Sequence, residues 1–408
     1  MHVTRSITRP VTQDSIFAGT DSQYSSVVVP RTDGLVLVFV LVAVALRIIF
    51  WVYTDRVWED ALITLNPAKN LWAGYGLTHH ALEPRVYSFT SMIAMLLSVI
   101  GEPFGQAINL IRFLSLVTAA GTIYFAAAIM RHFSMPTLAQ FACLAFLAAD
   151  HLQIFFGMAG METQIATCIA LATVFFCVTD RLIWFGVFAG LALLARPDMI
   201  IVDAICFVYL VLAKRWVLWK PALIAAAIIA PWITFTTLYY GSPIPHTITV
   251  KSFMNGPLSL DRSLSYASNL WKQFAPFWEF WFVKAVPVPE LAPIVVVALT
   301  AVCALIGIFA AVRQPRLLIV ALIVLAFATY LIWFAINPYF MWYAPPFVAF
   351  YFILVAAGLA AVRRSSAALA NVIGTIIAIA YSVPLAFTLP LDRIVQQDVE
   401  VGVRAKTG

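Results

Sequence analysis

Residues 34–54 read GLVLVFVLVAVALRIIFWVYT, and Arg47 is the only charged side chain in this run. A helix of about 20 apolar residues is long enough to cross the hydrocarbon core of a bilayer. Similar runs recur along the 408 residues, of which 63% are hydrophobic and 11% charged, whereas soluble domains carry roughly 25% charged residues. The sequence therefore predicts an all-α polytopic membrane protein embedded in the lipid bilayer.

The apolar runs predict about 11 transmembrane helices. The stretch 88–101 is apolar but too short to cross comfortably, and we interpret it as an interfacial or re-entrant helix. The predicted spans are about 34–54, 108–130, 137–150, 161–179, 182–195, 198–213, 220–239, 291–312, 316–336, 343–362 and 367–389.

The loop charges predict an orientation. With a cytoplasmic N-terminus, the short outer turns at about 151–160, 196–198 and 337–342 carry only Arg196. This is the positive-inside pattern of a protein integral to the cell (inner) membrane, and it places the loop 55–107 on the outer face. The short inner loops carry Arg131, Arg181, Lys214, Arg215, Lys220, Arg313, Arg316, Arg363 and Arg364. Because these basic residues are spread between spans, the net charge of +6 does not indicate a nucleic-acid partner.

The first outer loop contains WEDALITLNPAKNLWAGYGLTHHALEPRVYSFTS at residues 58–91. Its acidic pair, Glu59 and Asp60, lies at the membrane edge, where carboxylates are either functional or plain interfacial solvation. Helical spacing predicts one short helix over Trp58–Leu65, and Asn66-Pro67 predicts the start of a second that runs to Trp72. Gly74 and Gly76 are predicted stop signals.

Motifs in this loop resemble the first outer loop of GT-C glycosyltransferases, in particular the arabinofuranosyltransferase-like and mannosyltransferase-like branch that uses polyprenyl-phosphate sugars. Departures from the branch pattern are His79-His80, Glu83-Pro84, Met92 and His246, which affect donor and acceptor preference more than the reaction class. The resembling segments are Glu59–Thr64, Asn70-Leu71, Gly74–Leu77, Arg85–Tyr87, Phe89–Ser91, Gly160–Thr163, Ala195–Asp198 and Tyr239–Thr247, followed by Lys251.

The resemblance implies transfer of a sugar from a polyprenyl-phosphate carrier to a cell-envelope glycan or glycolipid on the outer face, by single displacement with a carboxylate base. It implies Asp60 as the catalytic base, with Glu59 as the alternative base, a metal ligand or a positioning group. Cations must meet the charge of the leaving phosphate. The candidate donor and phosphate contacts are Lys251, Arg196, Arg85 and His246, and the candidate pocket-lining residues are Glu162, Tyr87, Thr90 and Asp198.

No residue is assigned to a metal, although the resemblance leaves a divalent cation open. His79 and His80 are adjacent and therefore poorly placed to share one ion with the acids. Within spans, Arg47 is expected to snorkel outward and Asp203 to be paired or neutralised.

Two other functions are open. A transporter or flippase of a lipid-linked sugar would place paired charges at mid-membrane in broken helices, often with internal repeats. The sequence shows no repeat, and its acids, Asp150 among them, gather in the predicted outer segments, which favours the enzyme. A membrane acyltransferase with His79 or His80 as base is a third interpretation.

The predicted organisation follows from the spans and the resemblance. Residues 1–33 are expected to be a disordered cytoplasmic tail, and 34–255 a GT-C-like catalytic transmembrane module. An outer loop (256–290), C-terminal transmembrane helices (291–390) and an outer tail (391–408) complete the chain.

Overall fold

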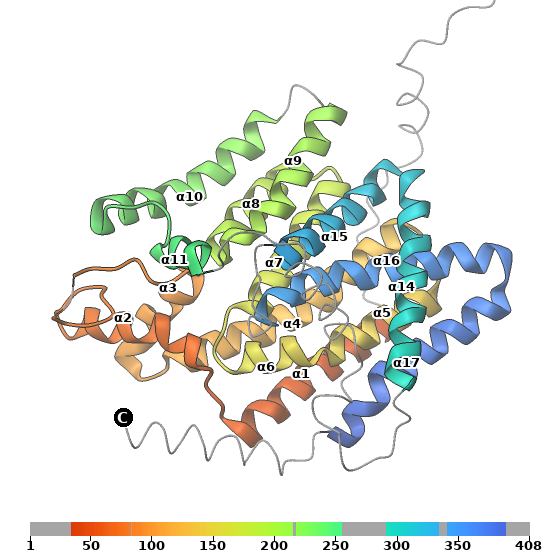
Figure 1. The fold of residues 1–408 in the computed structure, drawn as a ribbon, viewed down its shortest axis with the longest axis horizontal. Coiled ribbons are helices and arrows are strands. Elements are labelled where there is room, and N and C mark those ends of the chain that lie inside the picture. Colours follow the sequence, from red (N-terminus) through yellow and green to blue (C-terminus); the bar gives the residue numbers. More distant parts are fainter. Residues whose placement is uncertain (1–33, 83, 215–217, 255–290, 334–340, 389–408) are drawn as a thin grey trace, which may run out of the picture.

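The computed structural model describes residues 34–82, 84–214, 218–254, 291–333 and 341–388, and the regular structure in these ranges is helical (Figure 1). The predicted tails and the loop 256–290 lie outside the described residues. The long helices are α1 (Gly34–Thr54), α4 (Ala107–His132), α5 (Thr137–Ala149), α7 (Thr163–Val178), α8 (Leu182–Ala195), α9 (Ile200–Lys214), α10 (Trp219–Tyr240), α14 (Leu291–Val312), α15 (Pro315–Trp333), α16 (Ala344–Ser365) and α17 (Ala367–Thr388). Shorter helices are η2 (Glu59–Ala61), α2 (Leu62–Trp72), α3 (Met92–Gly101), η3 (Glu102–Phe104), α6 (His151–Met158), η4 (Pro197–Met199), α11 (His246–Met254) and η6 (Met341–Tyr343).

A helix occupies each predicted span, but length and composition support fewer crossings. In the described part of the chain, 7 helices are long and apolar enough to cross a membrane. The shorter apolar helices include α7, all of whose residues are buried. A helix surrounded by other helices has no need to match the lipid thickness. The count of 11 spans and the orientation therefore stay predictions.

The predicted outer turn at 151–160 is wrong, because the chain continues from α5 into α6 as one candidate span, Thr137–Met158. The side chain of Asp150 accepts a hydrogen bond from the amide of Leu152 at 3.0 Å. That amide would otherwise bond the carbonyl of Ala148, so the helix breaks at Asp150.

The expectation that Arg47 snorkels outward is also wrong. Arg47 is 1% exposed and donates to the carbonyl of Ala148 at 3.2 Å, the oxygen that the break leaves without its helical partner. It also donates to Gln164 Oε1 from Nε (3.0 Å) and Nη2 (2.7 Å). Partners on α5 and α7 therefore hold the guanidinium inside the bundle.

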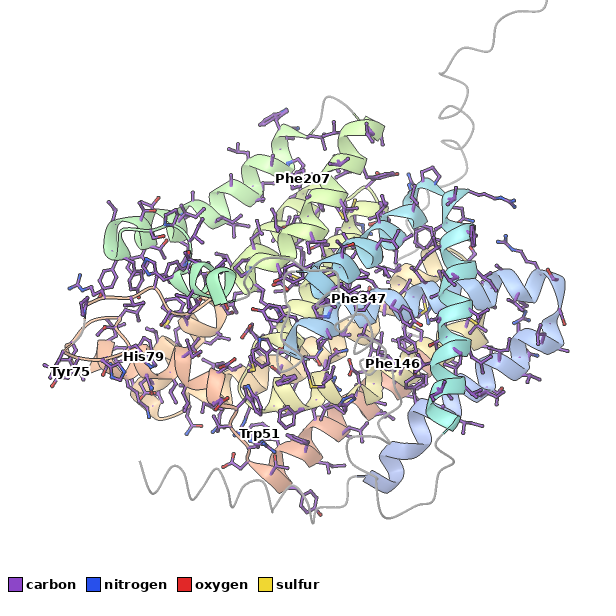
Figure 2. All side chains as sticks on the ribbon, viewed as in Figure 1. Trp51, Tyr75, His79, Phe146, Phe207 and Phe347 are labelled. Atoms are coloured by element: carbon purple, nitrogen blue, oxygen red, sulfur yellow. The ribbon has the colours of Figure 1, made fainter. Side chains whose placement is uncertain are left out.

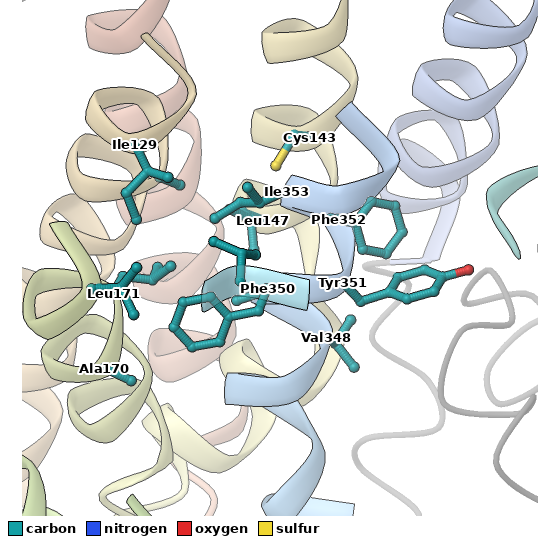
Figure 3. Close-up of a cluster of buried hydrophobic side chains, with 14 of the residues drawn as sticks. Ile129, Cys143, Leu147, Ala170, Leu171, Val348, Phe350, Tyr351, Phe352 and Ile353 are labelled. Atoms are coloured by element: carbon teal, nitrogen blue, oxygen red, sulfur yellow. The ribbon is translucent and has the colours of Figure 1, made fainter. Parts of the chain in front are cut away.

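The core centres on α16, whose residues from Ala344 to Leu359 are buried. Figure 3 shows Phe350 and Phe352 of α16 among buried side chains of α4, α5 and α7. Phe352 stacks on Phe146 of α5, with ring centroids 3.6 Å apart. In Figure 2, Phe146 and Phe347 lie in this core, whereas Tyr75 and His79 lie at one end of the molecule.

That end is formed by α2, α3 and α11, toward which α10 runs (Figure 1). Two glycines of α8 allow α10 to approach closely. A Cβ added to Gly186 would lie 2.7 Å from the carbonyl oxygen of Pro221, and one added to Gly190 would lie 2.8 Å from Cβ of Ile228. Small residues four apart form a flat helix face, which brings the ends of α8 and α10 together.

The two helices predicted in the first loop are instead η2 followed by a single α2, so the predicted helix start at Asn66-Pro67 is wrong. Pro67 lies inside α2, which therefore lacks one backbone hydrogen bond. The stop signals are confirmed, since α2 ends at Trp72 and Gly74 and Gly76 have φ of 87° and 86°. The stretch 88–101 contains α3, which begins at Met92 and is capped by Ser91.

Candidate active site

Asp60 lies in η2, which is held against the loop that follows α6. The amide of Trp58 donates to the carbonyl of Ala159 at 2.9 Å. Gly160 has φ of +91°, and a Cβ there would approach Cβ of Ala61 to 3.2 Å. The glycine therefore permits both the turn and the close contact, which brings Asp60 beside the start of α7.

Glu162 precedes α7 and interacts electrostatically with Asp60, Arg196 and Asp198. Tyr343 of η6 interacts with the same charged groups. We refer to Asp60, Glu162, Arg196, Asp198 and Tyr343 as the Asp60 cluster. Four of its members come from three separate sequence motifs, which the fold brings together.

Within the cluster, Arg196 and Asp198 form a buried ion pair that two hydrogen bonds join. Arg196 Nε and Nη2 donate to the two carboxylate oxygens of Asp198 at 3.0 and 2.8 Å. Nη1 donates to the carbonyl of Trp342 at 2.6 Å, and the guanidinium lies 4.5 Å from the ring centroid of Tyr343. Arg196 and Asp198 are 2% and 7% exposed. Arg196, a predicted phosphate contact, is thus engaged by protein groups.

The charges of the cluster shift the pKa of Glu162 and of Arg196. Burial raises the pKa of Glu162; Arg196 partly offsets this, whereas Asp198 and Asp60 add to the rise. Burial acts to lower the pKa of Arg196, but Asp198 and Glu162 outweigh it and raise the pKa above its usual value. The pKa of Glu162 is therefore raised, whereas Asp60, with which it interacts, is only half-buried. Glu59, the other predicted catalytic acid, is exposed.

Tyr87, a predicted pocket-lining residue, lies in an aromatic block, defined as Tyr87, Phe89, Trp232, Tyr239 and Tyr240. Tyr87 stacks on Tyr240, with centroids 5.2 Å apart and planes 11° apart. Trp232 Nε1 donates to the hydroxyl of Tyr87 at 3.0 Å. Burial raises the pKa of Tyr87 to about 12, although the Trp232 bond lowers it, so this hydroxyl stays neutral.

Hydrogen bonds to backbone groups of the first loop connect this loop to the block and to α11. The amide of His246 donates to the carbonyl of Tyr87 at 2.9 Å, and the amide of Tyr87 donates to Nδ1 of His246 at 3.1 Å. The hydroxyl of Tyr239 accepts from the amide of Leu77, whose carbonyl accepts from Tyr240. His246, a predicted donor contact, therefore fastens residues of the loop to α11.

The remaining predicted residues lie around the block. Arg85 is exposed, and its guanidinium lies 4.4 Å from the ring centroid of Tyr239. Thr90 is half-buried immediately before the capping residue of α3. Lys251 belongs to α11, but its side chain lies outside the described residues.

The Asp60 cluster and the aromatic block are contiguous. Ile63, three residues after Asp60, and Leu194, two residues before Arg196, both pack against the block. The sequence reasoning missed two aromatic residues here: Tyr343 of the cluster, and Trp342, whose carbonyl accepts a hydrogen bond from Arg196. Their signal was the aromatic run at the start of a span, which is equally typical of interface anchors. In the described residues, no group of three His, Cys, Asp or Glu is placed to hold a metal ion.

No protein-family model matches the chain, and no characterised protein matches it in sequence. Solved structures do match. The crystal structure of ArnT from Cupriavidus metallidurans bound to undecaprenyl phosphate aligns with a TM-score of 0.54 and 13% identity, over 89% of this chain and 77% of that one. The chain therefore shares its overall fold with ArnT. The apo ArnT structure gives a TM-score of 0.52 at 13% identity, over 88% and 76%.

The first of these ArnT structures holds bound undecaprenyl phosphate. At 13% identity the likeness concerns the fold alone. The roles of individual residues in this chain must therefore be argued from its own geometry.

Proposed function

We propose that this protein transfers a sugar from a polyprenyl-phosphate carrier to a glycan or glycolipid acceptor on the outer face of the cell membrane. The observation that carries the proposal is the convergence of Asp60 with Glu162, a half-buried carboxyl beside a buried one of raised pKa. Two neighbouring carboxyl groups in unlike environments are suited to acid–base work. The fold shared with ArnT and the undecaprenyl phosphate bound to ArnT support the same class of donor.

In this proposal Asp60 is the base of a single displacement. The acceptor hydroxyl oxygen attacks the anomeric carbon, the bond from that carbon to the phosphate oxygen breaks, and the carrier phosphate leaves with the electron pair. Asp60 takes the hydroxyl proton as the new bond forms. Glu162 forms a hydrogen bond with a sugar hydroxyl and so orients one of the substrates.

The carrier phosphate needs cations that are not already committed. Arg85 is exposed on the ring of Tyr239, and a guanidinium can bind a phosphate bidentately. We assign the phosphate to Arg85 and, from the family motif, to Lys251. Arg196 and His246 are instead assigned to positioning, because the first holds Asp198 and the second holds Tyr87.

One observation favours the alternative, a transporter or flippase of a lipid-linked sugar. A candidate span breaks at Asp150, and Arg47 lies within electrostatic reach of that carboxylate. Broken helices with buried charges are typical of transporters. Against this, the hydrogen bonds of Arg47 go to protein groups, which fill its surroundings.

The test compares Asp60→Asn with the matched change Glu59→Gln in reconstituted vesicles supplied with a radiolabelled polyprenyl-phosphate sugar and a candidate glycan acceptor. Loss of a general base should lower turnover about 10²–10⁴-fold for Asp60→Asn. Glu59→Gln should stay near the wild-type rate, and donor binding should survive in both variants.

Equal activity of Asp60→Asn and wild type would remove the proposed base. Movement of the labelled lipid between leaflets, without transfer and insensitive to Asp60→Asn, would favour the transporter.

A further inference from the structure

Arg112, near the start of α4, is a buried arginine that no family motif of the sequence includes. It is 2% exposed. Its Nε donates to the carbonyl of Met158 at 2.7 Å, and its Nη2 donates to the carbonyl of Arg56 at 2.8 Å. Nη1 donates to Asp55 Oδ1 at 2.6 Å and to Asn109 Oδ1 at 3.1 Å. One guanidinium thus bonds two chain segments as well as its own helix.

The two carbonyls occupy corresponding places in the candidate site. Arg56 lies four residues before Asp60, and Met158 lies four residues before Glu162. Between them, the amide of Trp58 bonds the carbonyl of Ala159. Arg112 therefore joins the segments that deliver the two carboxyl groups of the Asp60 cluster.

We infer that Arg112 is a positioning residue, which sets the register between Asp60 and Glu162. This inference rests on the proposed function for its catalytic consequence, but not for the register itself. A misplacement of about 1 Å in a catalytic group can lower turnover about 10²-fold.

The planar fork of Arg112 matters more than its charge. The carboxylate of its ionic partner, Asp55, belongs to a side chain that is 81% exposed, and exposed ion pairs contribute little. The carbonyl bonds are made by two different nitrogens of a rigid guanidinium, Nε and Nη2, which a single ammonium group cannot reproduce. Arg112→Lys should therefore fail to restore the register, although it keeps the charge.

The experiment measures hydrogen exchange and kinetics on full-length protein in vesicles, for Arg112→Met, Arg112→Lys and the control Asp55→Asn. Peptides covering Trp58 should exchange faster in both Arg112 variants. Peptides covering Tyr87, whose amide bonds His246, should not change. Turnover should fall about 10²-fold, with the donor KM within about twofold of wild type. Asp55→Asn should match the wild type in both measurements.

Unchanged exchange at Trp58 in Arg112→Met would overturn the inference, and so would full recovery by Arg112→Lys. Faster exchange with unchanged turnover would also overturn it, because the register would then not serve catalysis. If the wild type transfers no sugar, the proposed function fails, and the exchange measurements still decide whether Arg112 holds the register.

Discussion

The ion pair between Arg196 and Asp198 gives the sharpest stability prediction. Both side chains are buried, and three hydrogen bonds engage the guanidinium. Breaking a buried pair by removing one partner costs about 3–5 kcal/mol, because the remaining charge has no counterion. We expect Arg196→Met and Asp198→Leu each to lower the free energy of unfolding by that amount.

Arg196→Met should be the more damaging of the two. It also leaves the carbonyl of Trp342 without its donor and removes the cation that opposes the raised pKa of Glu162. The double variant should be more stable than the sum of the two losses predicts, because replacing a whole buried pair by apolar groups is often neutral. The coupling measured in this cycle should reach about 2–3 kcal/mol.

The assay is denaturant unfolding in detergent, followed by tryptophan fluorescence, together with binding of a polyprenyl-phosphate sugar to the folded variants. Additive losses, or single losses below about 1 kcal/mol, would refute the description of a buried ion pair. If the double variant is stable but no longer binds the donor, Arg196 contacts the carrier phosphate, as the sequence motif predicted.

Two further predictions concern buried acids. Burial raises the pKa of Glu162, so ionisation costs folding free energy as pH rises from the ordinary glutamate range through the folded pKa. Glu162→Gln should therefore melt above wild type at alkaline pH, and the difference should vanish at about pH 4; a constant difference would contradict this. Asp203 of α9 is 2% exposed, and neither carboxylate oxygen has a hydrogen-bond partner in the described residues. Asp203→Val should stabilise the fold by about 1–3 kcal/mol in thermal unfolding, and destabilisation would show a missed partner.

Apolar run length sufficed to predict where helices form, because a bilayer leaves the backbone few alternatives. It failed where a side chain competes with the backbone. The side chain of Asp150 accepts a hydrogen bond from the amide of Leu152 and breaks the helix there. The hydropathy pattern had instead predicted a turn over 151–160. Pro67 was predicted to begin a helix but lies inside α2, because this helix tolerates the missing backbone hydrogen bond.

The candidate site was predicted as separate motifs, and their grouping came only with the fold. Asp60, Glu162 and Asp198 meet because Gly160 and the buried pair of Arg196 bring three loops together. Sequence spacing could not show that Trp342 accepts a bond from Arg196, since 146 positions separate them. The role of Arg112 was hidden as well, because its bonds run to carbonyls 46 and 56 positions away and therefore leave no side-chain pattern.

The partners of Arg47 have a consequence for biogenesis. Helix α1 is the most apolar of the candidate spans, so it can enter the bilayer although an arginine near the middle of a span costs about 2.5–3.5 kcal/mol. The partners of Arg47, Ala148 and Gln164, lie 101 and 117 positions later in the chain. They must be synthesised before the guanidinium can form these hydrogen bonds. Helix α1 can therefore bury its arginine only after α5 and α7 have been made, which sets an order for the assembly of these three helices.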